Sequence, residues 1–293
     1  MFRVRGYLLE VGRRQPKERF MREWVDILAR CRYSEFRPVA GAPGDGEEIE
    51  IDFSRLQAYC RMQGLEMVKT DPAEVCGLYA DSANVVASTS SERSLAGRVE
   101  DMRENMQRAE AAGRSRAAER FLVADLGDEC MWQPPVASLP GLVMGGSFAA
   151  GGAKAAKMDL ERELDSILDA PLGGLVLRLG TLYLLGGAIR DGASEFFNIL
   201  ANPHGYSRHP AITQPVLDEV GAIARAARIV AERWVDRNDW AKEIVYMANL
   251  LDAACHRRDE TRLRELRDEH SRIWRMRFME PGRTESLARL PRF

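Results

Sequence analysis

The sequence predicts an α+β fold that is predominantly α-helical, with a small N-terminal β-α-β-α-β unit followed by a helical, bundle-like region. Near the N-terminus apolar side chains alternate with a period of two, which is typical of half-buried strands. Beyond residue 88 they recur every three or four positions, which is typical of helices with one buried face. The 293 residues are 45% hydrophobic and 29% charged, a composition that indicates a globular chain with one large core or two modest ones.

The N-terminal α/β unit is predicted over residues 1–88. Alternating apolar and basic residues indicate a strand over 2–11, and apolar residues at helical spacing after Pro16 indicate an amphipathic helix. Further strands are expected at 49–51 and 65–69, separated by a short helix that begins after Asp52 and ends before Gly64. The elements therefore follow each other as β-α-β-α-β.

Residues 89–143 are predicted to form a long helix and a connection. The sequence at 89–92 matches a capping box, and the apolar residues after it keep a 4-3-4-3 spacing up to about Gly113. Residues 121–126 indicate a short strand before a proline-rich connection. The apolar stripe is expected to pack on the protein's own core, or else on a partner helix as an oligomerisation surface. Its residues are Leu95, Val99, Met102 and Met106.

Residues 144–154, MGGSFAAGGAK, are interpreted as a Gly/Ala-rich hinge. A phosphate-binding loop of the form G-x-x-x-x-G-K-[ST] is disfavoured, because Lys154 comes two positions late and Ala155 follows it. The stretch also comes within one residue of the G-x-S-x-G nucleophile turn, as a degenerate G-x-S-x-A. Ser147 is therefore a weak catalytic candidate for a serine hydrolase, which would also need preceding parallel strands and a histidine downstream.

Residues 155–280 are predicted to be a helical domain, and 281–293 an extended tail. The apolar stretch 171–189 is nearly long enough to span a membrane, but Arg178 near its centre and several glycines favour a buried helix. The last two helices are expected to form an antiparallel pair. His270 occupies the apolar seam between them and is expected to be a hydrogen-bonded core residue.

Several chemistries find no support in the sequence. The five cysteines have no C-x-x-C spacing, and the histidines have no HExxH spacing, so neither a metal nor another cofactor is expected. The cysteine usage, and an N-terminus without a secretory pattern, lead us to expect a cytoplasmic protein. Basic residues are almost all arginine, a bias typical of the bacterial-like composition that a GC-rich genome encodes.

Charge distribution gives the one positive indication of function. The net charge is only −2, but residues 1–33 hold nine basic against four acidic residues, and 256–293 hold eleven against seven. The resulting hypothesis is a non-enzymatic binding or assembly subunit of an intracellular complex, with other protein subunits as partners and RNA or DNA backbone as a ligand. The alternatives are a protein-only helical scaffold, the hydrolase, or arginines that merely pair with nearby acidic residues. The surface expected to bind nucleic acid or an acidic partner comprises Arg13, Arg14, Arg257, Arg258, Arg272, Arg275, Arg277 and, for stacking, Trp274.

Overall fold

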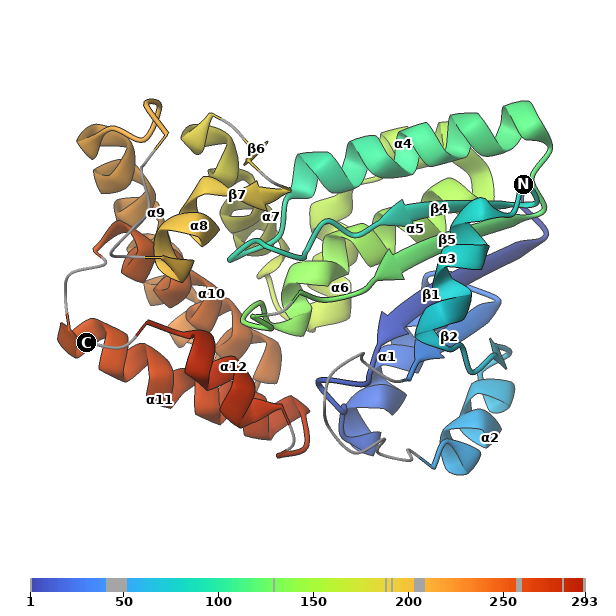
Figure 1. The fold of residues 1–293 in the computed structure, drawn as a ribbon, viewed down its shortest axis with the longest axis horizontal. Helices are drawn as coiled ribbons and strands as arrows, with labels where there is room; N and C mark the ends of the chain where they lie inside the picture. Colours follow the sequence, from blue (N-terminus) through green and yellow to red (C-terminus); the bar gives the residue numbers. More distant parts are fainter. Residues whose placement is uncertain are drawn as a thin grey trace.

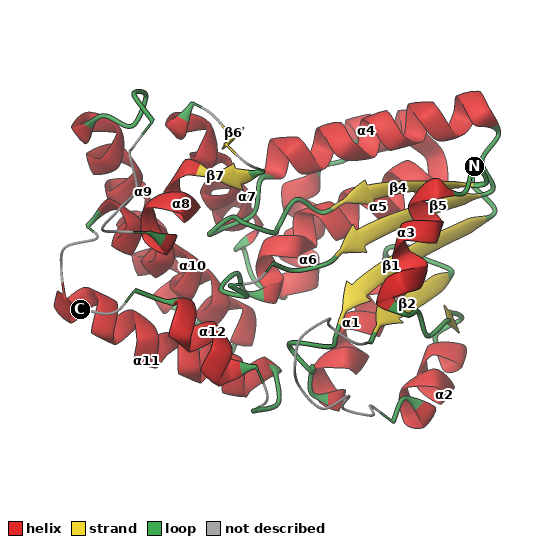
Figure 2. Ribbon diagram, in the orientation of Figure 1, coloured by secondary structure: helices red, strands yellow, loops and turns green. Residues whose placement is uncertain are grey.

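The computed structural model describes residues 2–40, 52–128, 130–187, 189–190, 192–202, 209–256, 260–280 and 282–291. Within these residues the protein is mostly helical and contains one five-stranded parallel sheet, which confirms the predicted fold class (Figures 1 and 2). The strand expected at 49–51 lies outside the described residues.

The sheet is built from segments that extend over more of the sequence than predicted. Its strands are β1 (Val4–Glu10), β2 (Glu35–Val39), β3 (Glu66–Met67), β4 (Asn84–Ser88) and β5 (Arg120–Asp125). The strands expected at 2–11, 65–69 and 121–126 correspond to β1, β3 and β5. Two strands are not predicted by the sequence pattern: β2, which contains Pro38 and so lacks a ladder N–H, and the short strand β4.

The strands are arranged in the order β3-β2-β1-β5-β4, and all of them are parallel. From the β4 edge the order is β4-β5-β1-β2-β3. Strand β5, the last of the five in the sequence, therefore pairs with β1, the first. This is the cyclic order of a parallel barrel that has been opened between β3 and β4. Because parallel strands end at a common edge, the segments after β1 and β5 leave the centre of the sheet side by side (Figure 1).

Helices cover both faces of the sheet. On one face Tyr7 contacts Trp24 of α1, with ring centroids 6.2 Å apart, and Gly145 of α5 packs against Val123. On the other face Val75 of α3 packs on Leu8 and neighbouring strand residues. Helix α3 crosses in front of the sheet in Figure 1. The helices of this region are α1 (Glu18–Arg30), α2 (Ser54–Met62), α3 (Pro72–Ala80), α4 (Val99–Arg116) and α5 (Leu139–Gly151).

The C-terminal half is a helical assembly in which α10 packs against α8, α9 and α11. The expected extended tail is wrong, because residues of α12 form a helix and bury Ser286 against His270. Among the described residues, no helix combines the length and the apolar character needed to cross a membrane. The elements are η1 (Pro135–Ser138), η2 (Gly152–Lys157), α6 (Leu160–Leu168), α7 (Gly173–Thr181), η3 (Leu182–Gly186), β6 (Ile189–Arg190), β7 (Ala193–Ser194), α8 (Glu195–Ala201), α9 (Gln214–Glu232), α10 (Asp239–Cys255), α11 (Glu260–Arg277) and α12 (Arg283–Arg289).

The capping box predicted at 89–92 is wrong. Helix α4 begins only at Val99, and the preceding loop has left-handed backbone at Ser90 and Arg93, each with a φ of 50°. The hydroxyls of Thr89 and Ser91 bind a carboxylate of the sheet, so they do not cap a helix. Tertiary hydrogen bonds thus override the local capping pattern.

The apolar stripe of this region lies in the protein's own core, as expected. Leu95, Val99, Met102 and Met106 are at most 2% exposed and belong to the main hydrophobic cluster. Leu95 lies in the loop before α4, and the other three lie on the helix itself. Because all four side chains are buried, the stripe offers no exposed surface for oligomerisation.

Residues 144–151 form the second half of α5, so the loop expected in this hinge is wrong. Its glycines allow close packing. A Cβ at Gly145 would come within 2.4 Å of a Val123 methyl, and one at Gly146 within 2.3 Å of the Cys31 carbonyl oxygen. Small residues are required here because the helix lies directly on β5 and on the end of α1.

Candidate ligand site at the carboxyl edge of the sheet

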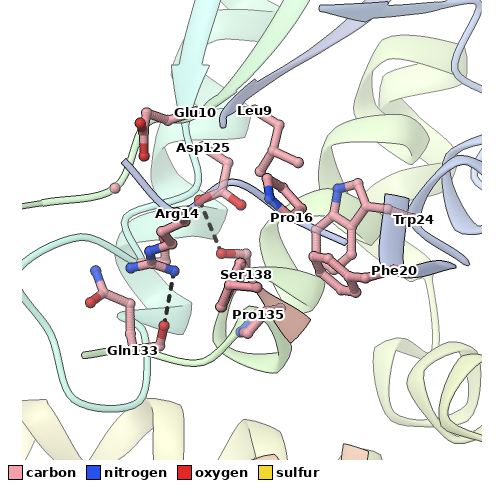
Figure 3. A pocket seen from close by; sticks show the side chains of 13 residues that line it. Leu9, Glu10, Arg14, Pro16, Phe20, Trp24, Asp125, Gln133, Pro135 and Ser138 are labelled. Carbon is pink, nitrogen blue, oxygen red and sulfur yellow. Dashed lines mark hydrogen bonds between the residues drawn. The ribbon is translucent and has the colours of Figure 1, made fainter. Parts of the chain in front are cut away.

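A small pocket lies where β1 and β5 end, between the sheet and the C-terminal helices. Segments far apart in the sequence line it: the loop after β1, helix α1, the loops after β4 and β5, and Phe278 beyond α11 (Figure 3). Its enclosed volume is about 30 Å³, which is room for about two water molecules. In open parallel α/β sheets, ligands bind at this carboxyl edge.

Asp125, the last residue of β5, is the polar centre of the pocket. Its Oδ2 accepts a hydrogen bond of 2.8 Å from the Tyr7 hydroxyl, and its Oδ1 accepts bonds of 3.0 Å from both Ser91 and Ser138 and of 3.2 Å from Thr89. Burial, together with the negative charge of Asp125, raises the pKa of Tyr7 well above its ordinary value, so the phenol remains a donor. These hydroxyls satisfy a carboxylate that is only 7% exposed.

Arg14 lies beside this carboxylate on the loop after β1. Its Nη1 donates to the Gln133 carbonyl oxygen at 3.0 Å, and its guanidinium carbon lies 5.8 Å from the centre of the Phe278 ring. Its Nε and Nη2 are buried and have no hydrogen-bond partner. No carboxylate in the described part of the chain forms an ion pair with it.

Two further buried groups in the pocket lack partners. Gln133 donates from Nε2 to Asp128 at 2.9 Å, but its Oε1 accepts no hydrogen bond. The indole N–H of Trp24 also has no acceptor. In Figure 3, Arg14 and Gln133 lie on one side of the Asp125–Ser138 hydrogen bond, and Trp24 lies on the other with Phe20. Residues that line the pocket thus hold three buried donor atoms and one buried acceptor without a hydrogen-bond partner.

The arginines predicted to bind nucleic acid are only partly brought together. Arg13 is half-buried, and its backbone N–H donates to Glu10 at 2.7 Å. Arg272 and Arg275 are exposed on α11, where Arg275 pairs with Glu280 at 3.4 Å. Arg257 and Arg258 lie outside the described residues.

Two of the predicted surface residues are buried. Arg277 is 3% exposed, pairs with Glu243 and Glu23, and lies over the ring of Trp240. Trp274 is 1% exposed, and its indole N–H donates to the Met279 carbonyl oxygen at 2.6 Å. Neither side chain is available on the surface to contact a phosphate or to stack on a base.

The segment before α1 and the segment after α11 lie side by side, although the two termini lie far apart in Figure 1. Pro16 and Phe278 form an antiparallel bridge. The N–H of Lys17 donates to the Arg277 carbonyl oxygen, and the N–H of Met279 to that of Gln15, both at 2.9 Å. This contact also forms one wall of the pocket.

Ser147 lies on α5 and does not line the carboxyl-edge pocket. Its hydroxyl contacts the sulfur of Met158 at 3.0 Å. An open cavity of about 490 Å³ lies beside it, and the described residues that line this cavity include Glu163 and Cys31 but no histidine. Burial raises the pKa of the Cys31 thiol to about 12. The described residues therefore supply no histidine as a general base next to Ser147.

His270 is a hydrogen-bonded core residue, as predicted. Its Nδ1 lies 2.6 Å from the Tyr246 hydroxyl, and its Nε2 lies 3.0 Å from the Ser286 hydroxyl. His204 lies outside the described residues, and His209 accepts a hydrogen bond from the Ala211 N–H. Within the described ranges, no group of three or more His, Cys, Asp or Glu side chains is arranged to hold a metal ion.

Comparison with known proteins adds no family to this description. No protein-family model matches the chain, and a search of curated proteins found no match. The fold and the site define a mostly helical α+β protein whose parallel sheet carries a polar pocket at its carboxyl edge.

Of the residues that make this pocket polar, the sequence indicates only Arg14. It does so through the local excess of arginine, and no sequence pattern places Arg14 in a pocket. Asp125 could have been found, because it is next to the last residue of the strand predicted over 121–126, and the ends of parallel strands meet at one edge. Gln133 and Ser138 follow no motif, and only the folded chain brings them to Arg14 and Asp125.

Proposed function

We propose that the protein is a binding protein that holds a small polar ligand at the carboxyl ends of β1 and β5. The observation that supports this proposal is the gathering of unpartnered, buried polar atoms of Arg14, Gln133 and Trp24 around one pocket. A buried polar atom without a partner costs about 1–3 kcal/mol. A ligand that pairs with several of these atoms recovers part of that cost.

The pocket combines this polarity with apolar walls. Phe20 and Trp24 form one side, and Phe278 closes another. Ligand sites in proteins are commonly apolar clefts with a few polar groups that fix orientation. The 30 Å³ volume matches one polar group of a ligand, and the half-buried Glu10 and Gly127 mark the side where the rest would leave the pocket.

The proposal is tested by native mass spectrometry of the full chain purified from its host. We expect small-molecule adducts on the wild-type protein and their loss in Gln133→Leu, which removes the free acceptor. Gln107→Leu is the matched control, because Gln107 is exposed on α4. The proposal fails if the wild-type protein carries no adduct and no compound of a metabolite panel raises its melting temperature.

A second candidate is contact with a nucleic-acid backbone, within a larger assembly, through the arginines that remain on the surface. It is favoured by the bridge between Pro16 and Phe278, which brings the basic segment before α1 next to the end of α11. Binding to single-stranded RNA and DNA across a salt series tests it. We expect a negative slope of log affinity against log salt, and this slope should become shallower by about 0.7 for each phosphate that Arg272→Gln or Arg275→Gln no longer binds. No binding at low salt excludes this function.

A further inference from the structure

We infer that the ligand of this pocket binds through a carboxylate, whose two oxygens accept hydrogen bonds from Nε and Nη2 of Arg14. The inference rests on the proposed function and names the chemical class of ligand. One nitrogen of the Arg14 guanidinium makes a hydrogen bond, and the other two have no partner.

The single hydrogen bond of Arg14 determines which edge of its guanidinium is offered. Nη1 donates to the Gln133 carbonyl oxygen at 3.0 Å, and this bond holds the planar group in place (Figure 3). The two free nitrogens, Nε and Nη2, lie on one edge of the plane. Their N–H bonds run parallel at the spacing of two carboxylate oxygens, so this edge binds a carboxylate in a bidentate manner.

The described lining of the pocket holds one cation, Arg14, and two carboxylates, Asp125 and Glu10. Arg14 is half-buried, its Nε and Nη2 atoms are fully buried, and none of the described carboxylates forms an ion pair with it. The oxygens of Asp125 are occupied by four hydroxyls, and Glu10 accepts the backbone N–H of Arg13. Because the acceptor atoms of Asp125 and Glu10 are engaged elsewhere, a bound carboxylate would give the free edge of Arg14 the paired acceptors that it lacks.

The size of the pocket restricts the anion further. A volume of about 30 Å³ accommodates the planar carboxyl group, with the remainder of the ligand outside. The Gln133 carbonyl and its unpartnered Oε1 present acceptor atoms on the same side of the pocket. These acceptors disfavour sulfate, whose additional oxygens carry no hydrogen to donate to them.

The experiment titrates the full-length protein with sodium formate and sodium acetate at constant ionic strength, with sodium chloride and sodium sulfate as competing anions. We expect a saturable rise in melting temperature with formate and acetate, and none with the other two salts. Arg14→Lys keeps the positive charge but cannot donate two parallel hydrogen bonds to a carboxylate. This variant should weaken carboxylate binding at least tenfold. Arg162→Gln removes an exposed arginine of α6 and should leave binding unchanged.

A second measurement covers the case in which the Arg14 variants do not fold. Saturation-transfer NMR on the wild-type protein should detect bound formate through its C–H proton, and acetate should displace it while chloride should not. Equal effects of sulfate or chloride, or full carboxylate binding by a folded Arg14→Lys protein, would overturn the inference. If the native adducts persist but carry no carboxylate, the proposed function stands and this inference is wrong. If wild-type protein binds neither adducts nor carboxylates, both are wrong.

Discussion

Glu243 and Arg277 form an ion pair from which water is almost fully excluded, with 0% and 3% of each residue exposed. The other oxygen of Glu243 accepts the Val136 N–H at 2.8 Å, and Arg277 also pairs with Glu23 of α1 at 2.7 Å. Burial raises the pKa of Glu243, although the guanidinium beside it acts in the opposite direction. The pair thus connects η1 and α1, on the sheet side, with α10 and α11.

Replacement of Arg277 should be among the most destabilising changes in the chain. Arg277→Met leaves Glu243 buried without a counter-charge, and we expect the free energy of unfolding to fall by about 3–5 kcal/mol. Chemical denaturation measures this loss. Arg275→Met is the matched control, because Arg275 is exposed and makes only a surface pair; it should change stability by about 0.5 kcal/mol or less. Equal stability of the two variants would contradict a structural role for the buried pair.

His270 should make stability depend on pH. Ser286 donates to the Cys130 carbonyl oxygen, so its hydroxyl accepts from Nε2–H of His270, and the Tyr246 hydroxyl donates to Nδ1. The bond from Tyr246 requires an unprotonated Nδ1 and therefore a neutral ring, and burial lowers the pKa of His270 to about 3. Because its pKa in the unfolded chain is about 6.5, the unfolded state binds more protons between these values. The contribution of His270 is therefore fully present above pH 6.5 and is lost as the pH falls toward 3.

The measurement compares wild type with His270→Gln by chemical denaturation from pH 7.5 to 4.5. The variant should be less stable at pH 7.5. The difference in the free energy of unfolding between the two proteins should shrink by up to about 1.4 kcal/mol per pH unit below pH 6.5. The other titrating groups affect both proteins alike and cancel in the difference. If this difference in the free energy of unfolding stays constant from pH 7.5 to 4.5, the imidazole of His270 is not held neutral.

The glycines of α5 should not tolerate a side chain. In Gly146→Ala the new Cβ would meet the Cys31 carbonyl oxygen at 2.3 Å, so α5 must move away from the end of α1. We expect a loss of about 1–3 kcal/mol, as for overpacking elsewhere. Gly77→Ala is the control, because Gly77 lies in α3 with nothing within 4 Å of the added Cβ, and it should stabilise the protein by about 0.5–1 kcal/mol. If Gly146→Ala leaves the free energy of unfolding unchanged, that result would instead favour a flexible segment at this position.

The strands of the sheet and the loop after β4 show how far the sequence could predict the structure. Periodicity located β1, β5 and most long helices, because a regular element with one buried face must repeat its apolar residues. It did not locate β2 or β4, which are short and are stabilised by pairing with β1 and β5. The hydroxyls of Thr89 and Ser91 read locally as a helix cap, whereas their actual acceptor is Asp125, more than thirty positions away.

The residues of the candidate site could also be predicted only in part from the sequence. The excess of arginine indicated Arg14, but it grouped that residue with Arg277 and Trp274, which are buried in different contacts. Whether an arginine is paired depends on side chains from distant elements, such as Glu243 for Arg277, and no spacing rule encodes such a pairing. The unpartnered edge of Arg14 is a property of the folded chain alone.

Met102 should distinguish a core role of the apolar stripe from an interface role. Met102 lies on the inner face of α4, and its side chain is fully buried, so Met102→Ala should lower the free energy of unfolding by about 2–5 kcal/mol. Met102→Glu should prevent stable folding at 37 °C, because the buried carboxylate would have no partner. Met62→Glu is the control, because Met62 is 79% exposed on α2 and should leave stability within about 0.5 kcal/mol. Thermal unfolding and size-exclusion chromatography measure stability and oligomeric state together. An interface would behave differently: Met102→Glu would remain folded and change only the oligomeric state, and that result would contradict the packing of α4 on the protein's own core.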